Sequence, residues 1–74
     1  MNKVLYESPN GNLRIVYNWQ HYFAHYDIQR MYHVYDVEYG GYTKYFGLCR
    51  TVQTMEDAME YIREYDDSVA IVYR

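Results

Sequence analysis

Histidine and cysteine are among the residue types of this chain that could support catalysis or metal binding at neutral pH. His21 and His25 are four residues apart, so on a helix both imidazole rings would lie on one face, as some zinc sites require. His33 would be a third ligand, but no acidic residue or cysteine stands at a recognisable companion spacing. The sequence therefore favours ordinary histidines at the surface or at the edge of the core, and we expect no metal and no cofactor.

Cys49 would act as a nucleophile only with a base within hydrogen-bonding reach. The predicted strand pairing places His33 on the strand next to Cys49 but on the opposite face of the sheet. The pair Gly40-Gly41 does not open a helix, so the chain has no glycine-rich phosphate loop either. We therefore expect a protein that is not an enzyme, in which Cys49 is a small apolar filler.

Tyrosine accounts for 12 of the 74 residues. Its side chain is large and stiff, and it packs in a core or makes specific contacts outside one. Half of the residues are hydrophobic, and a chain of this length forms a single domain, residues 1–74, near the lower size limit for one core. The composition predicts a compact binding module.

The lone cysteine cannot form an intramolecular disulfide and is typical of a reducing compartment. Residues 1–12 lack the apolar run of a signal peptide, and no segment approaches the ~18 apolar residues of a membrane span. The formal charge is −3, with ten acids against seven Lys and Arg, whereas a sequence-independent grip on phosphates needs a basic surface. We expect a cytoplasmic protein that binds neither membranes nor nucleic acid directly.

Two registers remain open for the first predicted β-hairpin, in which residues 8–11 (SPNG) connect apolar segments. A type I turn around Pro9 with a bulge at Gly11 places one apolar set on a common face: Leu5, Leu13, Ile15 and Tyr17. A tight turn at Asn10-Gly11 places a different apolar set on one face: Val4, Tyr6, Ile15, Tyr17 and Trp19. This second register also sets Glu7 opposite Arg14, which is a favourable cross-strand charge pair.

The second predicted hairpin has Gly40-Gly41 as a two-residue loop, which pairs Tyr39 with Tyr42. One face of this hairpin is the better core candidate because it contains Val37, Phe46 and Leu48. That face collects His33, Tyr35, Val37, Tyr39, Tyr42, Lys44, Phe46 and Leu48. The other face is expected to be partly solvated and collects Tyr32, Val34, Asp36, Glu38, Thr43, Tyr45, Gly47 and Cys49.

A helix is predicted from Thr54, the N-cap, with Asp57 at the third helical position. Its buried stripe is Met55, Ala58, Met59 and Ile62. Residues 69–73 are nearly all apolar, as expected of a strand covered on both faces, and the intervening helix suits a right-handed β-α-β crossover.

Residues 18–30 fit either a short helix, by the spacing of their aromatic side chains, or a strand, by their aromatic content. The sequence thus predicts an α+β fold. We expect a small, antiparallel-rich sheet of four or five strands with one main helix, in the order ββ(α)ββαβ.

Exposed tyrosines and acids are the candidates for partner binding. Tyr32 and Tyr45 share a predicted sheet face with Asp36 and Glu38, unless residues 18–30 cover it. Exposed aromatic rings can stack nucleobases, but neighbouring carboxylates repel phosphates, so a protein partner is the better inference. A second candidate contact surface is the acidic side of the helix, where the same residues are also explained by simple solvation: Glu56, Glu60 and Glu64.

In size, acidity, aromatic richness and hairpin-plus-helix layout, the chain resembles the small proteins that phages use against host defences, including anti-CRISPR proteins. The resemblance spans the whole chain and includes no specific motif, so no functional residue is carried over. It implies a non-catalytic inhibitor, acting in the host cytoplasm, that occludes a nucleic-acid-binding surface of a basic host effector. The alternatives are a small RNA- or DNA-binding regulator that stacks bases on its tyrosines, and an accessory protein whose tyrosines meet across a homodimer.

Overall fold

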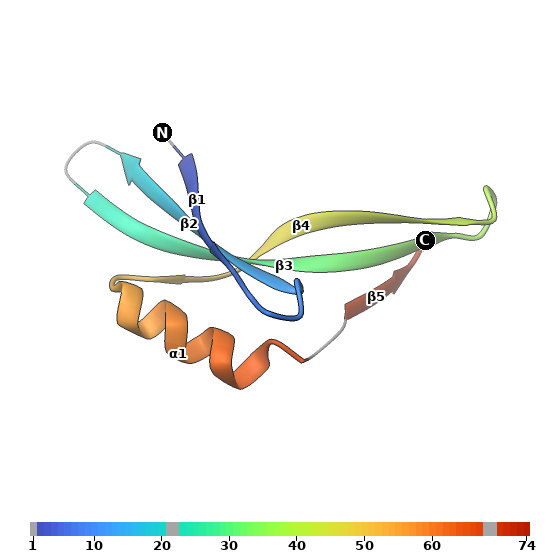
Figure 1. The fold of residues 1–74 in the computed structure, drawn as a ribbon. Helices are drawn as coiled ribbons and strands as arrows, with labels where there is room; N and C mark the ends of the chain where they lie inside the picture. Colours follow the sequence, from blue (N-terminus) through green and yellow to red (C-terminus); the bar gives the residue numbers. More distant parts are fainter. Residues whose placement is uncertain (1, 21–22, 68–69) are drawn as a thin grey trace.

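The computed structural model describes residues 2–20, 23–67 and 70–74, and within them the chain forms an α+β fold with one helix (Figure 1). The expected class, a small sheet of four or five strands with one main helix, is confirmed. The elements are β1 (Asn2–Glu7), β2 (Leu13–Gln20), β3 (Phe23–Asp36), β4 (Gly41–Val52), α1 (Met55–Tyr65) and β5 (Ala70–Tyr73).

The long strand β3 organises the sheet, because every other strand except β1 pairs with it. Strands β1 to β4 are antiparallel neighbours in chain order, and β5 runs parallel to β3. One edge of β3 is shared end to end: β2 pairs with residues 23–30 and β5 with residues 32–35. At the junction, the backbone N–H of Met31 donates to the carbonyl of Asn12 at 2.7 Å.

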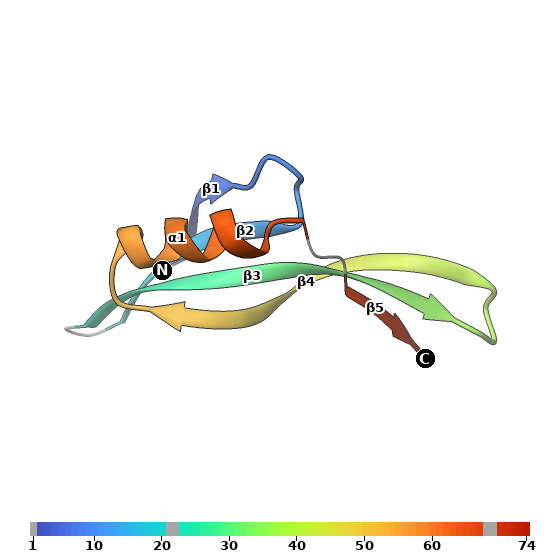
Figure 2. The same cartoon turned by 90° about the horizontal axis from the view of Figure 1, so that it is seen from below.

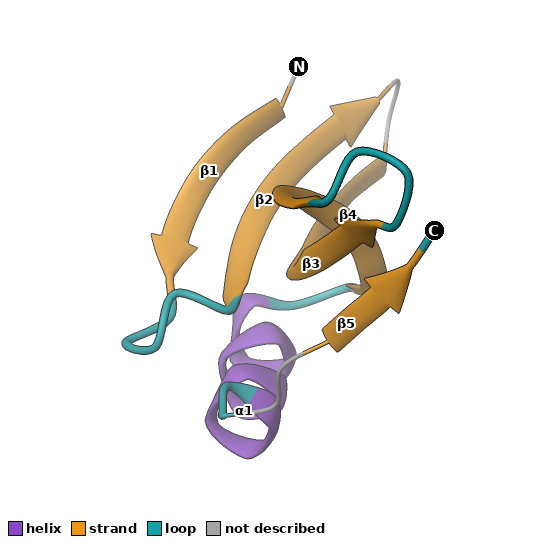
Figure 3. Ribbon diagram, turned by 90° about the vertical axis from the view of Figure 1, so that its right-hand side faces the viewer, coloured by secondary structure: helices purple, strands orange, loops and turns teal. Residues whose placement is uncertain are grey.

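Helix α1 forms the second layer of the fold and covers one face of one end of the sheet (Figures 2 and 3). The hydroxyl oxygen of Thr54 accepts a hydrogen bond from the backbone N–H of Asp57 at 3.1 Å, so the predicted N-cap is confirmed. The helix packs its small and branched side chains against residues of β2 and β3. The buried cluster consists of Leu13, Ile15, Ile28, Ala58 and Ile62, with Met55 and Met59 packed against it.

The end of α1 is tied to the turn between β1 and β2. The side chain of Asp66, which is buried, accepts a hydrogen bond from the backbone N–H of Asn10 at 3.0 Å. The Asn12 side-chain amide donates to the backbone carbonyl of Asp66 at 2.8 Å. Two polar contacts therefore fix where the helix ends relative to the first hairpin.

The first hairpin combines the two registers that the sequence allowed. Glu7 lies opposite Arg14 and Tyr6 opposite Ile15, as the charge pair predicts. The turn nevertheless follows the Pro9 alternative, because the N–H of Gly11, at φ 75°, donates to the carbonyl of Ser8 at 2.9 Å. A β-bulge between Val4 and Tyr6 inserts one extra residue into β1. The strand therefore pairs in one register beside the turn and in the other register beyond the bulge.

The second hairpin is longer at its turn than predicted, so the predicted pairing of Tyr39 with Tyr42 is wrong. Tyr42 pairs with Tyr35, and β3 ends at Asp36. The Asp36 carboxylate accepts hydrogen bonds from the N–H groups of Glu38 at 3.0 Å and Tyr39 at 3.2 Å. An aspartate that binds the backbone of a turn in this way favours the longer loop. The register differs from the predicted one by an even number of residues, so the paired residues keep their predicted faces, whereas Val37, Glu38 and Tyr39 lie in the turn and belong to neither face.

The choice of core face within that hairpin was wrong. Leu48 is 63% exposed and Tyr39 88% exposed, and Val37 and Tyr42 are exposed as well. The buried face is the opposite one, which Ile28 shares with Leu13 and Ile15 of β2, because α1 packs there. Which face a helix covers is a tertiary choice, and the apolar content of the hairpin alone does not determine it.

Two further expectations are corrected. Residues 18–20 and 23–30 are strand, so the helical alternative for this segment is wrong. Within this segment, Tyr26 lies opposite Tyr17 of β2, with the ring centroids 5.5 Å apart. The strand β5 is not covered on both faces, since Ile71 and Tyr73 are exposed; Val69, which was assigned to it, lies outside the described residues. The predicted β-α-β crossover is not formed either. Strand β5 runs parallel to β3 and not to β4, the strand that directly precedes the helix.

Candidate functional site

A groove of about 340 Å³ lies between α1 and the open side of β4. The acids of the groove are spaced three and four residues apart on the helix, which brings them to one side of it, and β4 contributes one arginine. We call this site the acidic groove; it is lined by Arg50, Val52, Asp57, Glu60, Tyr61, Glu64 and Tyr65. Three carboxylates against one guanidinium give the groove a negative charge.

Two tyrosine rings line the acidic groove. The centroids of Tyr61 and Tyr65, one helical turn apart, are 4.5 Å from each other, with the ring planes at 40°. The guanidinium carbon of Arg50 lies 5.6 Å from the centroid of Tyr61, a separation at which a cation is attracted to an aromatic ring. The groove therefore already holds one guanidinium against an aromatic face.

The hydroxyl of Tyr61 is anchored beneath the groove. It lies 3.1 Å from Cys49 Sγ, within hydrogen-bonding distance, and it also hydrogen-bonds with Arg30. The hydrogen bond with Cys49, together with burial, raises the pKa of Tyr61 above its ordinary value, while Arg30 acts in the opposite direction. Cys49 itself is half-buried and packs against the core cluster, where it orients the tyrosine.

Tyr32 of β3 and Tyr45 of β4 form a second aromatic site. They are directly opposite each other on β3 and β4, and their rings stack with centroids 5.3 Å apart and planes at 20°. Tyr45 is 49% exposed and Tyr32 is half-buried. Gly47 makes room for the stack, because a Cβ at this position would lie 3.1 Å from Tyr32 Cε2.

Arg30 links the tyrosine stack to the acidic groove. It lies opposite Gly47 in the sheet, next to the stacked pair, and it reaches the hydroxyl of Tyr61. The sequence predicted that Tyr32 and Tyr45 share a face, and they do. The sequence analysis did not predict that Tyr61 and Tyr65 belong to the site. Their spacing of four residues, next to Glu60 and Glu64, indicates that both rings lie on one side of the helix.

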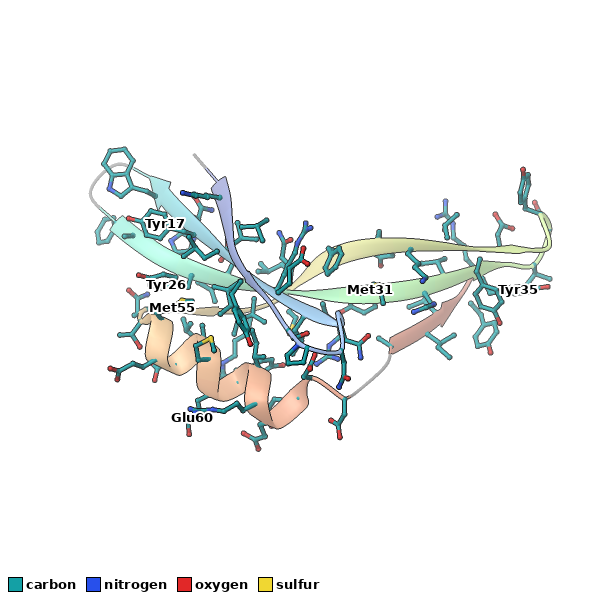
Figure 4. The ribbon with its side chains drawn as sticks, in the orientation of Figure 1. Tyr17, Tyr26, Met31, Tyr35, Met55 and Glu60 are labelled. Atoms are coloured by element: carbon teal, nitrogen blue, oxygen red, sulfur yellow. The ribbon has the colours of Figure 1, made fainter. Side chains whose placement is uncertain are left out.

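The remaining acids singled out from the sequence lie elsewhere. Asp36 binds the backbone of the β3–β4 turn, and Glu38 lies within that turn, so neither flanks the tyrosine stack as expected. Glu56 lies on another side of α1, beside a separate groove that Met55, Met59 and Arg63 also line. Glu60 borders both grooves and points away from the sheet, whereas Met55 lies toward it (Figure 4).

The histidines form no metal centre in the part of the chain that the structure describes. His25 Nε2 lies 3.5 Å from Asp27 Oδ1, and His33 lies opposite Lys44, while His21 is outside the described residues. No group of three or more His, Cys, Asp or Glu side chains among residues 2–20, 23–67 and 70–74 is arranged to hold a metal ion. Within these same ranges, no helix has the length and apolar character needed to cross a bilayer.

Comparisons with known proteins give no family for this chain. No protein-family model matches the sequence, and neither a curated protein nor a solved structure matches it significantly. The functional argument therefore depends on the geometry and chemistry of the acidic groove and the tyrosine stack.

Proposed function

We propose that this chain is a non-catalytic protein-binding module whose acidic groove receives an arginine- or lysine-rich segment of a basic partner. The observation that carries the proposal is the convergence of three carboxylates and two tyrosine rings on one groove. Carboxylates and aromatic faces both bind a guanidinium, the first by paired hydrogen bonds and the second by cation–π attraction.

The arrangement of the groove supports a cationic side chain over other ligands. Glu60 and Glu64 are exposed on the helix, so they would mainly accelerate association and select a partner of opposite charge. Tyr61 is held in place through Cys49 and Arg30, so little conformational entropy is lost when a partner packs on its ring. Within the chain, the guanidinium of Arg50 already lies beside the ring of Tyr61, which is the kind of contact that we propose for a side chain of the partner.

The stack of Tyr32 and Tyr45 supplies the apolar anchor of the proposed interface. Binding energy at interfaces is concentrated in a few aromatic residues, and surrounding charges exclude the wrong partners. Because Arg30 connects the stack to the groove, a partner segment a few residues long would contact both.

Within this class, the resemblance to phage proteins directed against host defences suggests the narrower version of the proposal. The partner would be a host effector with a basic nucleic-acid-binding surface, and the chain would act as a stoichiometric inhibitor that covers it. An acidic groove mimics the charge of a nucleic acid backbone, which is the property such an inhibitor needs.

The test is a titration of the isotope-labelled chain with an oligo-arginine peptide, followed by NMR chemical shifts. We expect the largest shifts at the acidic groove, and loss of binding when Glu60 and Glu64 are both replaced by glutamine. The matched control replaces Glu38 and Glu56 by glutamine, which removes the same charge outside the groove and should leave most of the affinity. Equal losses in the two variants, or tighter binding of a single-stranded oligonucleotide than of the peptide, would overturn the proposal.

A further inference from the structure

Three strands of the described chain have an edge without a neighbouring strand, and one of them differs from the other two. Strand β1 carries a lysine and a β-bulge, and β4 carries Lys44, Arg50 and a bulge opposite Ile28 and Gln29. Lysines and bulges protect an edge from pairing with another chain. Strand β5, Ala70–Tyr73, has four uncharged residues, no proline and a regular register with β3.

The side chains of β5 are also uncovered. Ile71 is 53% exposed and Tyr73 69% exposed on one face, and Val72 is exposed on the other. In this end of the molecule, strands β3, β4 and β5 form a single layer, because α1 stops before it (Figures 1 and 2). Sheets are stable when their apolar faces and edges are paired, so β5 is the part of the described chain that most lacks a neighbour.

The backbone groups of β5 that face the open edge follow from its hydrogen bonds to β3. The N–H of Arg74 donates to the carbonyl of Tyr35 at 2.9 Å, and the carbonyl of Arg74 accepts from the N–H of Val37 at 3.0 Å. Backbone groups alternate in direction along a strand. Arg74 and Val72 therefore face β3, and the N–H and C=O groups of Ile71 and Tyr73 point to the open edge.

We propose that a second copy of this chain pairs with β5 across a two-fold axis, so that the two sheets join edge to edge. In the antiparallel register that uses both outward-facing residues, Ile71 lies opposite Tyr73 of the partner subunit, and Val72 faces Val72 of the partner subunit. Each of the two Ile71–Tyr73 pairs exchanges two backbone hydrogen bonds. The interface is self-complementary, as a two-fold dimer requires.

The charges at the ends of β5 favour a second copy of this chain as the partner of the strand. Arg74 follows the strand, and Asp67, which is exposed, precedes it at the C-terminal end of α1. Antiparallel pairing brings Arg74 of each chain to the end of β5 near Asp67 of the partner subunit. The helix C-terminus adds a partial negative charge at the same place, so opposite charges meet at both ends of the shared ribbon.

An aromatic cluster borders the proposed interface and would be extended by it. Tyr35 contacts Tyr42, with ring centroids 4.7 Å apart, and Tyr73, with centroids 6.1 Å apart. Pairing would bring Ile71 of the partner subunit beside Tyr73 on this face. Because β5 is short, the buried area falls at the low end for specific interfaces, and we expect a dimer with a Kd in the micromolar range.

The experiment is sedimentation equilibrium of the full chain from low micromolar to submillimolar concentration. We expect a monomer–dimer equilibrium that Arg74→Glu weakens about tenfold by replacing two attractions with two repulsions. Asp67→Lys should weaken it similarly, and the double variant R74E/D67K should restore it. The matched control, Lys3→Glu, makes the same charge change at the edge of β1 and should leave dimerisation unaltered. A chain that stays monomeric throughout, or a double variant that does not recover, would overturn the proposal.

A crosslinking measurement keeps the test independent of charge and fixes the register. In a Cys49→Ala background, Val72→Cys places two thiols at a facing position with a Cα separation of about 4.5 Å, which suits a disulfide. Ile71→Cys, one residue away, faces Tyr73 of the partner subunit instead. We expect V72C to form a covalent dimer much faster than I71C, with far-UV circular dichroism unchanged. Equal crosslinking rates for the two variants would contradict the proposed pairing.

Discussion

The two halves of β3 have different neighbours, although each half contains one buried residue. Residues 23–30 lie in the end of the sheet that α1 covers, and Ile28 in this half is completely buried. Residues 31–36 extend beyond the helix with β4 and β5, and Val34, which is 5% exposed, is the buried side chain of this half. Residues 24–29 alternate apolar and polar types, whereas residues 31–36 repeat two apolar residues followed by a polar one. Phe23, at the end of the covered half, is 77% exposed, so burial along this strand depends on its neighbours as well as on its composition.

The lengths of the elements explain the difference. An 11-residue helix spans about 16 Å, whereas a 14-residue strand spans about 46 Å. One helix of this size can cover only part of β3, and the Asp66 contacts place it over the β2 end. The half that remains uncovered carries the tyrosine stack and β5, the surfaces that we assign to contacts with other chains.

The largest expected effect is on stability, from the covered half. Ile28→Ala removes a fully buried side chain beneath α1, and we expect the free energy of unfolding to fall by about 3 kcal/mol. Ile71→Ala in the uncovered half truncates an exposed residue and should cost less than about 1 kcal/mol at monomer concentrations. Urea denaturation of the two variants measures both values. Similar losses would break the comparison between the halves.

The capping hydroxyl of Thr54 should contribute a smaller amount to the covered half. Thr54→Ala removes the acceptor for the Asp57 N–H at the start of α1 and should lower the free energy of unfolding by about 1 kcal/mol. Thr54→Ser keeps the acceptor and is the matched control. If serine and alanine were equally destabilising, the cap would not be the source of the effect.

The smallest expected effect is a change in pH dependence. Because the pKa of Tyr61 is raised in the folded state, its contribution to stability is complete below the unfolded value near 10 and is lost as pH rises through the folded pKa. Tyr61→Phe should therefore flatten the fall in unfolding free energy above about pH 10 relative to the parent chain. Thermal unfolding at a series of alkaline pH values measures this slope. Tyr39→Phe, at an exposed position, is the control and should leave the slope unchanged.

Local signals in the sequence predicted the elements of the covered half. The N-cap at Thr54 and the stripe of Ala58 and Ile62 fixed the helix, because caps and helical spacing are properties of neighbouring residues. The pair of Glu7 and Arg14 indicated the register of the first hairpin. The core face of the second hairpin could not be predicted in this way, because it depends on where α1 docks. The predicted two-residue turn at Gly40-Gly41 is wrong because the Asp36 side chain binds backbone N–H groups of a longer loop.

The candidate site was predictable in part for the same reason. Tyr32 and Tyr45 were placed on one face because the predicted register of β3 and β4, although wrong, differs from the observed one by an even number of residues. Glu60 and Glu64 were predicted as part of a contact surface on the helix, but the groove that they line with Arg50 was not, because the sequence does not indicate which side of the helix meets β4. The predicted position of Glu38 beside Tyr32 is wrong, because the turn is longer than predicted and includes Glu38.

The most direct test of the central claim is a double variant in the tyrosine stack, Tyr32→Ala with Tyr45→Ala. If the stack is a contact surface, the variant should unfold cooperatively with a loss of no more than about 2 kcal/mol. Its binding to a basic partner, measured with the oligo-arginine peptide, should weaken by about 2 kcal/mol or more. A variant that no longer folds would show that this face is core, and a folded variant with unaltered peptide binding would show that the contact surface lies elsewhere.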